Sequence, residues 1–387
     1  MGKSFKIAVV SGSRAEFGLL ERSLATLRNA PWCDLKLLVA GMHLVPQLGF
    51  TVRDVEAHFE IAARIQMHPP EDSCRGMALS VARGMSEFTN VLSRLQPQLL
   101  LLLGDRTEPF AAALACAYLG IPIAHVHGGD SSGNAIDDFQ RHAISRLACI
   151  HLAATEQSAS TLRALGVEGT VRVVGAPGLD AIVGRQVRPK EELARSLGLP
   201  LCPWLVVLQH PNPVESDAAE PQMKTLLEAA QQVAAENGAL LVILYPNNDA
   251  GHGGMLAAIE DFPPHTRSRS FASLPRAEYL DLLSHALLRV GNSSSAMIES
   301  ASIGIPVVNI GNRQEGRERD ANVVDSSFQV EEIVAACRQA LTDPKIQAAL
   351  HSRSSIYGDG RASMRIVQAL EEFSRSTAVG VTEDTTS

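Results

Sequence analysis

The chain has 387 residues, a formal net charge of −8, 45% apolar residues and 20% charged ones. This length exceeds what one hydrophobic core usually serves, so we expect two domains of roughly 180 residues each. The apolar fraction excludes a largely disordered chain, and the acidic balance argues against nucleic acid or an anionic membrane as the main partner. A small anionic ligand is still compatible with this composition, because it needs only two or three well-placed cations.

The six cysteines are scattered, with no CxxC pair and no Cys/His cluster at zinc spacing. We therefore expect buried free thiols and no metal site. The N-terminal apolar run is too short for a signal peptide, and no stretch approaches the ~20 apolar residues of a membrane span. These features predict a cytoplasmic protein.

Short apolar runs alternate with longer amphipathic stretches, and continuous apolar runs are typical of parallel strands covered on both faces. The first half predicts a strand at 6–10, a helix at 17–28, and further strands at 35–40, 99–104, 121–127 and 170–175. The second half predicts strands at 204–210, 239–246, 285–292 and 305–311. The repeated alternation of strand and helix indicates an α/β protein with two Rossmann-like, doubly wound domains facing across a cleft.

A segment rich in glycine, proline and charge, 178–203, separates the two series of strands and is interpreted as a hinge followed by a helix. We place an N-terminal domain at 1–178 and a C-terminal domain at 179–375. The assignment leaves open that the last helix packs back on the N-terminal domain. Residues 376–387 are small and polar and are expected to form a flexible tail.

In doubly wound sheets the ligand binds beyond the carboxyl ends of the strands, so polar residues directly after a strand carry most weight. The first such segment, Ser11–Gly18, is not GxGxxG, and no acidic residue ends the second strand. A dinucleotide site is therefore not indicated. The glycine turn with Arg14 at a helix start fits either an anion site or a tight turn with a solvated arginine.

Three serines, Ser293, Ser294 and Ser295, follow a predicted strand and open a helix. Free backbone N–H groups, the helix dipole and the hydroxyls together would bind a diphosphate, and Glu299 one turn further on would bind a sugar diol. The alternative is ordinary serine capping, for which one serine suffices.

The loop after 305–311 carries Arg313, Gln314 and Arg317, which suit phosphate or uracil but also fit a charged solvent loop. His210 and Asn247 each follow a strand on the same predicted rim. A lone histidine in such a position is more often structural than functional.

The N-terminal half places acids and bases after its strands: Asp105 and Arg106 after 99–104, then His127 and Asp130, then Asp137. A Gly-Asp-Arg corner could simply cap a helix. Two strand-end positions with several titratable groups nevertheless favour acid/base chemistry. Together with a diphosphate site in the other half, this pattern suits chemistry on a sugar joined to a nucleoside diphosphate.

In GSRAEFGLL, LLGDRTEPFAAAL, IAHVHGGDSSGNAIDDFQRHAISRL, YPNNDAG and GNSSSAMIESASIGIPVVNIGNRQEGR, the chain resembles the hydrolysing UDP-N-acetylglucosamine 2-epimerases of the sialic-acid and legionaminic-acid pathway branch. The resemblance covers nearly the whole chain and implies the GT-B fold with the active site between the domains. It implies UDP contacts from Arg14, Arg106, His210, Asn247, Ser293, Ser294, Glu299 and Arg313. It places Asp105 and Asp137 at acid/base positions.

The chain departs from many family members, which carry HIEGG with a catalytic glutamate where this sequence has HVHGG followed by Asp130. The base that removes the C2 proton is therefore either His127 or a neighbouring carboxylate. The GSRAEFG turn also differs from the Pro-Glu and Lys pattern of non-hydrolysing epimerases, which favours release of a free sugar.

The resemblance implies that UDP leaves first, that a 2-acetamidoglucal forms, and that water adds back with C2 inverted. Neither a redox cofactor nor a metal is expected, and a homo-oligomer is implied by resemblance alone. The alternatives are a non-hydrolysing epimerase, a GT-B glycosyltransferase and a UDP-sugar-binding protein without catalysis. The C4 and C6 substituents of the sugar cannot be read from the sequence.

Overall fold

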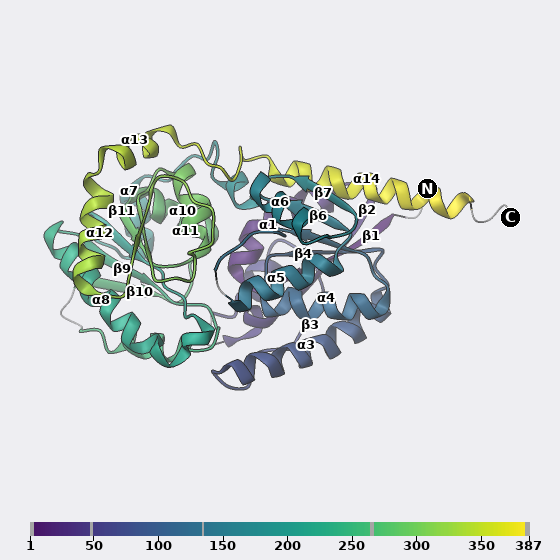
Figure 1. Cartoon of the computed structure of the whole chain (residues 1–387), viewed down its shortest axis with the longest axis horizontal. Coiled ribbons are helices and arrows are strands. Elements are labelled where there is room, and N and C mark those ends of the chain that lie inside the picture. The colour runs from purple at the N-terminus through teal and green to yellow at the C-terminus, as the bar shows by residue number, and fades with distance from the viewer. Residues whose placement is uncertain (1–3, 47–48, 134, 264–266, 384–387) are drawn as a thin grey trace.

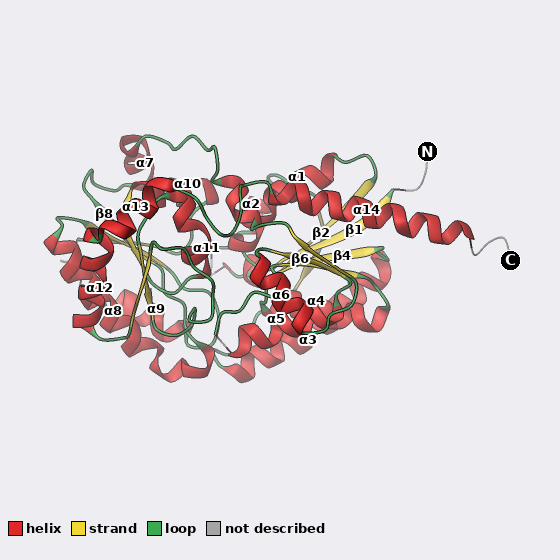
Figure 2. Ribbon diagram, turned by 45° about the horizontal axis from the view of Figure 1, so that its top comes forward, coloured by secondary structure: helices red, strands yellow, loops and turns green. Residues whose placement is uncertain are grey.

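The computed structural model describes residues 4–46, 49–133, 135–263 and 267–383. These residues form two sheets in separate halves of an elongated molecule, with helices on both faces of each sheet (Figure 1 and Figure 2). The first sheet has the strand order β3-β2-β1-β4-β5-β6-β7, and the second has the order β10-β9-β8-β11-β12-β13. All pairings in both sheets are parallel. The prediction of two Rossmann-like domains is confirmed.

The strands of the first sheet are β1 (Phe5–Ser11), β2 (Cys33–Ala40), β3 (Ile61–Ile65), β4 (Leu99–Leu103), β5 (Ile123–Val126), β6 (Ile150–Ala153) and β7 (Thr170–Val173). The helices of this half are α1 (Arg14–Asn29), α2 (Val52–Glu56), α3 (Cys74–Leu95), α4 (Thr107–Leu119), α5 (Ala135–Leu147) and α6 (Glu156–Ala164), with short 3₁₀ turns at η1 (Gly41–Leu44) and η3 (Pro177–Ala181).

The strands of the second sheet are β8 (Trp204–Val207), β9 (Leu240–Leu244), β10 (Ser268–Phe271), β11 (Ala286–Val290), β12 (Val307–Ile310) and β13 (Val323–Ser326). Its helices are α7 (Lys190–Leu197), α8 (Ala219–Glu236), α9 (His252–Glu260), α10 (Arg276–His285), α11 (Ser294–Ile303), α12 (Val330–Thr342) and α13 (Pro344–Ser352), with a 3₁₀ turn at η4 (Pro213–Ala218). The last helix of the chain is α14 (Ala362–Glu383).

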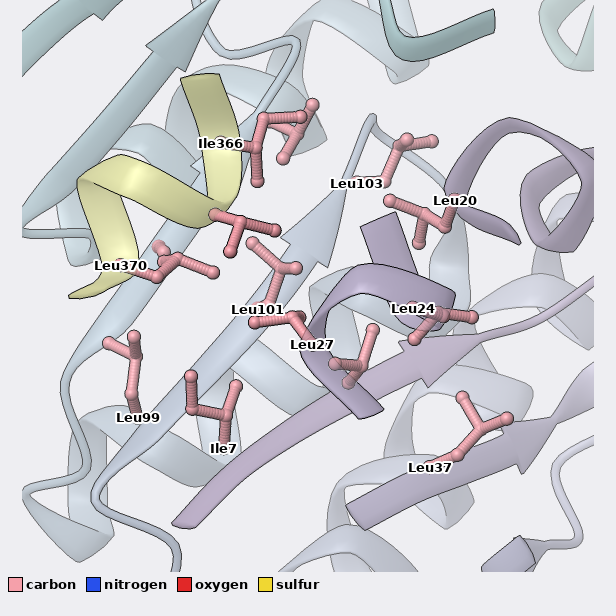
Figure 3. Close-up of a cluster of buried hydrophobic side chains, with 14 of the residues drawn as sticks. Ile7, Leu20, Leu24, Leu27, Leu37, Leu99, Leu101, Leu103, Ile366 and Leu370 are labelled. Atoms are coloured by element: carbon pink, nitrogen blue, oxygen red, sulfur yellow. The ribbon is translucent and has the colours of Figure 1, made fainter. Parts of the chain in front are cut away.

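Continuous apolar strands produce the two-sided core. Every residue of β4 is buried, and alternate side chains point into clusters on opposite faces of the sheet. One of these clusters contains Leu20 and Leu24 of α1 together with Ile366 and Leu370 of α14 (Figure 3).

Helix α14 therefore packs against the N-terminal sheet although it follows the C-terminal domain in sequence. It continues to Glu383, so most of the segment expected as a flexible tail is helical; residues 384–387 lie outside the described residues.

All six cysteines are free thiols. Cys116 and Cys337 are buried as expected, whereas Cys74 is exposed because it lies at the start of α3. None of the described helices combines the length and apolarity that a membrane span requires.

The strand order reverses between β1 and β4 in the first sheet and between β8 and β11 in the second. At such a switch point the loops after the two neighbouring strands diverge and leave a crevice at their carboxyl ends. The segments 12–18 and 104–108 lie at the first crevice, and 208–212 and 291–295 lie at the second. Each domain thus has one crevice at the carboxyl ends of its strands.

Candidate active site in the interdomain cleft

A cavity of about 310 Å³ lies between the two domains. Its lining includes all the residues that sequence reasoning singled out, from the N-terminal domain (Arg14, Asp105, Arg106, His127, Asp130 and Asp137) and from the C-terminal domain (His210, Asn247, Ser293, Ser294, Ser295, Glu299, Arg313, Gln314 and Arg317). The structure therefore brings the two predicted groups of residues to one cavity.

Arg14 is the first residue of α1, and Arg106 is the N-cap residue of α4. Arg14 Nη1 donates to Ser273 Oγ of the other domain at 2.9 Å. Arg106 Nη2 donates to Asn248 Oδ1 across the cleft at 2.7 Å, and its Nε lies 3.5 Å from Glu108 Oε2. Both arginines thus form hydrogen bonds with the C-terminal domain.

Two carboxylates of the N-terminal domain are held by arginines. Asp105 forms an ion pair with buried Arg141, which also binds Asp138 at 2.7 Å. Asp137, in the first turn of α5, lies 3.0 Å from Arg313 of the other domain. Burial raises the pKa of Asp137 although Arg313 opposes the shift. The raised pKa of Asp137 suits a carboxyl that donates a proton.

His127 and Asp130 form a buried hydrogen-bonded pair. His127 has a φ of 61°, in the left-handed region, and its Nδ1 lies 2.9 Å from Asp130 Oδ2. Asp130 also contacts Arg317 Nη1 at 2.9 Å and accepts from Ser158 Oγ at 2.8 Å. Burial raises the pKa of Asp130, but His127 and Arg317 outweigh burial, so the net pKa lies below its ordinary value.

An ionised Asp130 accepts a hydrogen bond from Nδ1–H of His127. With the proton on Nδ1, the lone pair of the ring lies on Nε2, where among the described residues no hydrogen-bond partner is found. The left-handed turn and the following Gly128 and Gly129 place this ring at the cavity wall. This arrangement can supply a base at the cavity wall.

The serine segment opens α11 toward the cavity. Ser293 is the N-cap residue, but its side chain makes no capping hydrogen bond to the helix. Ordinary serine capping therefore does not account for this residue. The first N–H groups of α11 and the hydroxyls line the cavity as a site for an anion.

Glu299 lies one turn further along α11 and is fully buried. Its two oxygens accept from Arg276, at 2.6 Å to Nη2 and at 3.1 Å to Nη1. Arg276 holds Glu299 in place at the cavity wall, and the carboxylate keeps lone pairs for a diol.

His210 is neutral at the C-terminal side of the cavity. Burial lowers its pKa well below the ordinary value, and the cations Arg313 and Arg106 add to the shift. Its Nδ1 accepts the backbone N–H of Asn247 at 3.0 Å, which leaves the proton on Nε2. His210 is thus a neutral donor.

Sequence reasoning missed Arg276, Tyr279 and Ser273, which also line the cavity. Ser273 follows β10, a short polar edge strand that apolar patterning does not reveal. Arg276 is the first residue of α10 and Tyr279 lies in its first turn, and without a recognised strand before them the strand-end rule does not select either residue. If the strand at Ser268–Phe271 had been predicted, the strand-end rule would have selected Ser273.

The family model described as UDP-N-acetylglucosamine 2-epimerase matches residues 25–371. The chain belongs to this epimerase family.

Two relatives with assigned activities cover most of the chain. It is 36% identical over 369 residues to the UDP-N,N'-diacetylbacillosamine 2-epimerase (hydrolyzing) of Legionella pneumophila, covering 95% of each chain. It is 30% identical over 329 residues to the GDP/UDP-N,N'-diacetylbacillosamine 2-epimerase (hydrolyzing) of Campylobacter jejuni, covering 84% of each.

Among solved structures, the UDP-GlcNAc 2-epimerase of Methanocaldococcus jannaschii in complex with UDP-GlcNAc and UDP superposes with a TM-score of 0.79. The identity is 17%, and the match covers 95% of this chain and all of the other. This likeness shows the fold that the epimerase family shares.

Proposed function

We propose that this protein is a hydrolysing 2-epimerase that converts a UDP-2-acetamido sugar and water to UDP and the free sugar inverted at C2. UDP-N-acetylglucosamine, giving N-acetylmannosamine, and its 2,4-diacetamido-2,4,6-trideoxy analogue are the candidate substrates. One observation carries the proposal: a single cavity joins an anion site on the C-terminal domain to acids and bases on the N-terminal domain. The names of both relatives, each a hydrolysing 2-epimerase, support it.

The C-terminal side suits a diphosphate leaving group. The N–H groups at the start of α11, the Nε2–H of His210 and the guanidinium of Arg313 all line the cavity. These donors stabilise the negative charge that grows on UDP as the C1–O bond breaks. Glu299 then binds the ribose diol.

The leaving group must depart before C2 can be inverted, because an unactivated C2–H is too weakly acidic for any side chain. As the bond from C1 to the UDP oxygen breaks, C1 gains positive character and acidifies the C2 proton. His127 Nε2 takes that proton, and its electron pair forms the C1–C2 double bond of a 2-acetamidoglucal. Asp130 stabilises the resulting imidazolium.

Hydration then reverses the elimination on the other face of C2. Asp137, whose pKa burial raises, delivers a proton to C2. Asp105 accepts a proton from the water whose oxygen bonds to C1. One water is consumed and no redox change occurs, so the residues of the cavity suffice for the chemistry.

A product analysis tests the proposal. The protein is incubated with each candidate substrate, and UDP and sugar products are measured by mass spectrometry and chromatography. We expect one UDP and one free C2-inverted sugar for each substrate consumed. An epimerised UDP-sugar would instead identify a non-hydrolysing epimerase, transfer to an acceptor a glycosyltransferase, and absence of UDP release a binding protein.

We also propose that this reaction belongs to nonulosonic acid biosynthesis, as the sequence resemblance implies, and that it takes place in the cytoplasm. Assembly into a homo-oligomer stays a prediction from that resemblance.

A further inference from the structure

A buried arginine lies directly behind the serine segment of α11. Arg289 belongs to β11, where Leu288 and Val290 point to the opposite face of the sheet, and it is 1% exposed. Its Nη2 donates to Ser295 Oγ at 2.8 Å, whereas Nη1 has no hydrogen-bond partner. Among the described residues, no carboxylate forms an ion pair with Arg289.

The hydroxyl of Ser295 joins this arginine to the cavity. Ser295 Oγ lies 3.1 Å from Ser293 Oγ and 3.1 Å from Tyr279 Oη. Because Arg289 occupies an acceptor position of Ser295 Oγ, the hydroxyl proton of Ser295 points to another acceptor. All three of these hydroxyl residues line the cavity.

A buried, unpaired charge is costly, and a guanidinium cannot lose its proton to avoid the cost. The charge of Arg289 also reaches the cavity, because it contributes to the lowered pKa of neighbouring His210, after burial and two other arginines. An anion at the start of α11 would supply the missing counter-charge.

We infer that Arg289 is a positioning residue for the diphosphate: it acts through Ser295 to orient the serine hydroxyls and supplies buried positive charge to the leaving group. The inference rests on the proposed function, since it assumes that a nucleoside diphosphate binds here. It predicts that the contribution of Arg289 grows with the number of phosphates and vanishes for the nucleoside.

Calorimetric titration of the full chain with UDP, UMP and uridine tests this inference. We expect Arg289→Met to weaken UDP binding at least tenfold, to weaken UMP binding less, and to leave uridine binding within twofold. Arg289→Lys keeps the charge and should recover part of the UDP affinity. The matched control is Arg269→Met, which removes an exposed arginine from β10 of the same sheet and should change none of the three affinities.

Ser295→Ala provides a second test with a smaller structural change. It removes the hydroxyl between Arg289 and the cavity, and we expect the same selective loss for UDP. Equal losses for UDP and uridine in the variants would show a merely structural role and overturn the inference, as would unchanged UDP binding. Failure of the unaltered protein to bind UDP would overturn the proposed function as well.

Discussion

Asp130 determines which nitrogen of His127 is available to a ligand. The 2.9 Å contact with Nδ1 fixes the ring orientation and the tautomer, and Ser158 and Arg317 fix the carboxylate in turn. A glutamate carries lone pairs on both carboxylate oxygens, whereas a neutral histidine carries one basic lone pair, and the partner of the ring selects the nitrogen that holds it. The loop that carries His127 in place of the glutamate of the HIEGG pattern therefore also carries Asp130, the partner of this histidine.

His127→Asn removes the proposed base but keeps a small polar side chain. We expect kcat to fall by about 10² to 10⁴-fold, the usual contribution of a positioned base, with UDP affinity within threefold of the original value. Steady-state UDP release and calorimetry measure the two effects. His58→Asn, at an exposed position, is the control. Equal losses in kcat and in affinity would assign His127 to binding instead.

Glu16 makes stability depend on pH. Burial and then the neighbouring Glu108 raise its pKa from 4.5 to about 7. Because the folded protein retains this proton while the unfolded chain loses it, the contribution to stability is full below pH 4.5 and is lost as the pH rises to 7.

We compare the free energy of unfolding of Glu16→Gln with that of the unaltered protein. We expect the difference to shift in favour of the variant by about 2 to 3 kcal/mol from pH 5 to pH 8. Urea unfolding at the two pH values measures the difference. The control Glu60→Gln, at an exposed position, should show the same free energy difference at both. A pH-independent effect of Glu16→Gln would contradict the raised pKa.

At the residue scale, the rule that ligands lie beyond strand ends is sufficient to locate Asp105, His210 and Arg313 from the sequence. It could not locate Arg276 or Arg289, because the first begins a helix after a strand that apolar patterning does not reveal and the second lies within a strand. The importance of these two arginines comes from their tertiary partners, Glu299 and Ser295, which no local pattern reveals.

At the element scale, α9 is capped from the other domain. Its N-cap, Gly251, offers no side chain, and Asp72 accepts from the N–H of Gly251 at 2.7 Å and of Gly253 at 2.8 Å. His252 Nδ1 also contacts Asp72 at 2.9 Å. These contacts of Asp72 with the start of α9 form only when the domains are together.

Asp72→Ala should weaken domain closure by about 1 kcal/mol, the usual value of a helix cap, and raise KM about fivefold. Steady-state kinetics measure KM, and small-angle scattering of the ligand-free protein should show a larger radius of gyration. Asp343→Ala, which removes a cap of α13 within one domain, is the control and should lower stability alone. An unchanged KM for Asp72→Ala would exclude this contact from closure.

Strands with continuous apolar runs were predictable, whereas the edge strands β3, β10 and β13 were not. Strand β3 has only one buried residue and β10 has the sequence SRSF, so neither shows an apolar run. The expected strands at 121–127 and 305–311 begin later, at Ile123 and Val307, because Pro122 and Pro306 lack a backbone N–H. Helix α1 begins at Arg14, earlier than apolar spacing predicted, because Ser13 caps it.

At the scale of the whole molecule, ion pairs join the two domains. Arg317 and Arg313 of the C-terminal domain bind Asp130 and Asp137 of the N-terminal domain. These pairs hold the acids and the anion site at one cavity. The two domains were predictable from the repeated pattern, but their closed arrangement depends on such pairs and was not.

Helix α14 returns the end of the chain to the N-terminal core. Leu370 is fully buried there, whereas Met364 on the same helix is 67% exposed. We expect Leu370→Ala to lower the free energy of unfolding by about 2 to 5 kcal/mol and Met364→Ala by less than about 0.5 kcal/mol. Urea unfolding measures both. Similar small effects for the two variants would show that α14 contributes little to the fold.

The central claim is that the N-terminal domain removes and returns the C2 proton while the C-terminal domain stabilises departing UDP. Turnover in deuterated water tests it most directly, with the released sugar observed by proton NMR. We predict one deuterium at C2 of every product molecule and an equal amount of UDP. A product that keeps its original C2 proton would contradict the account.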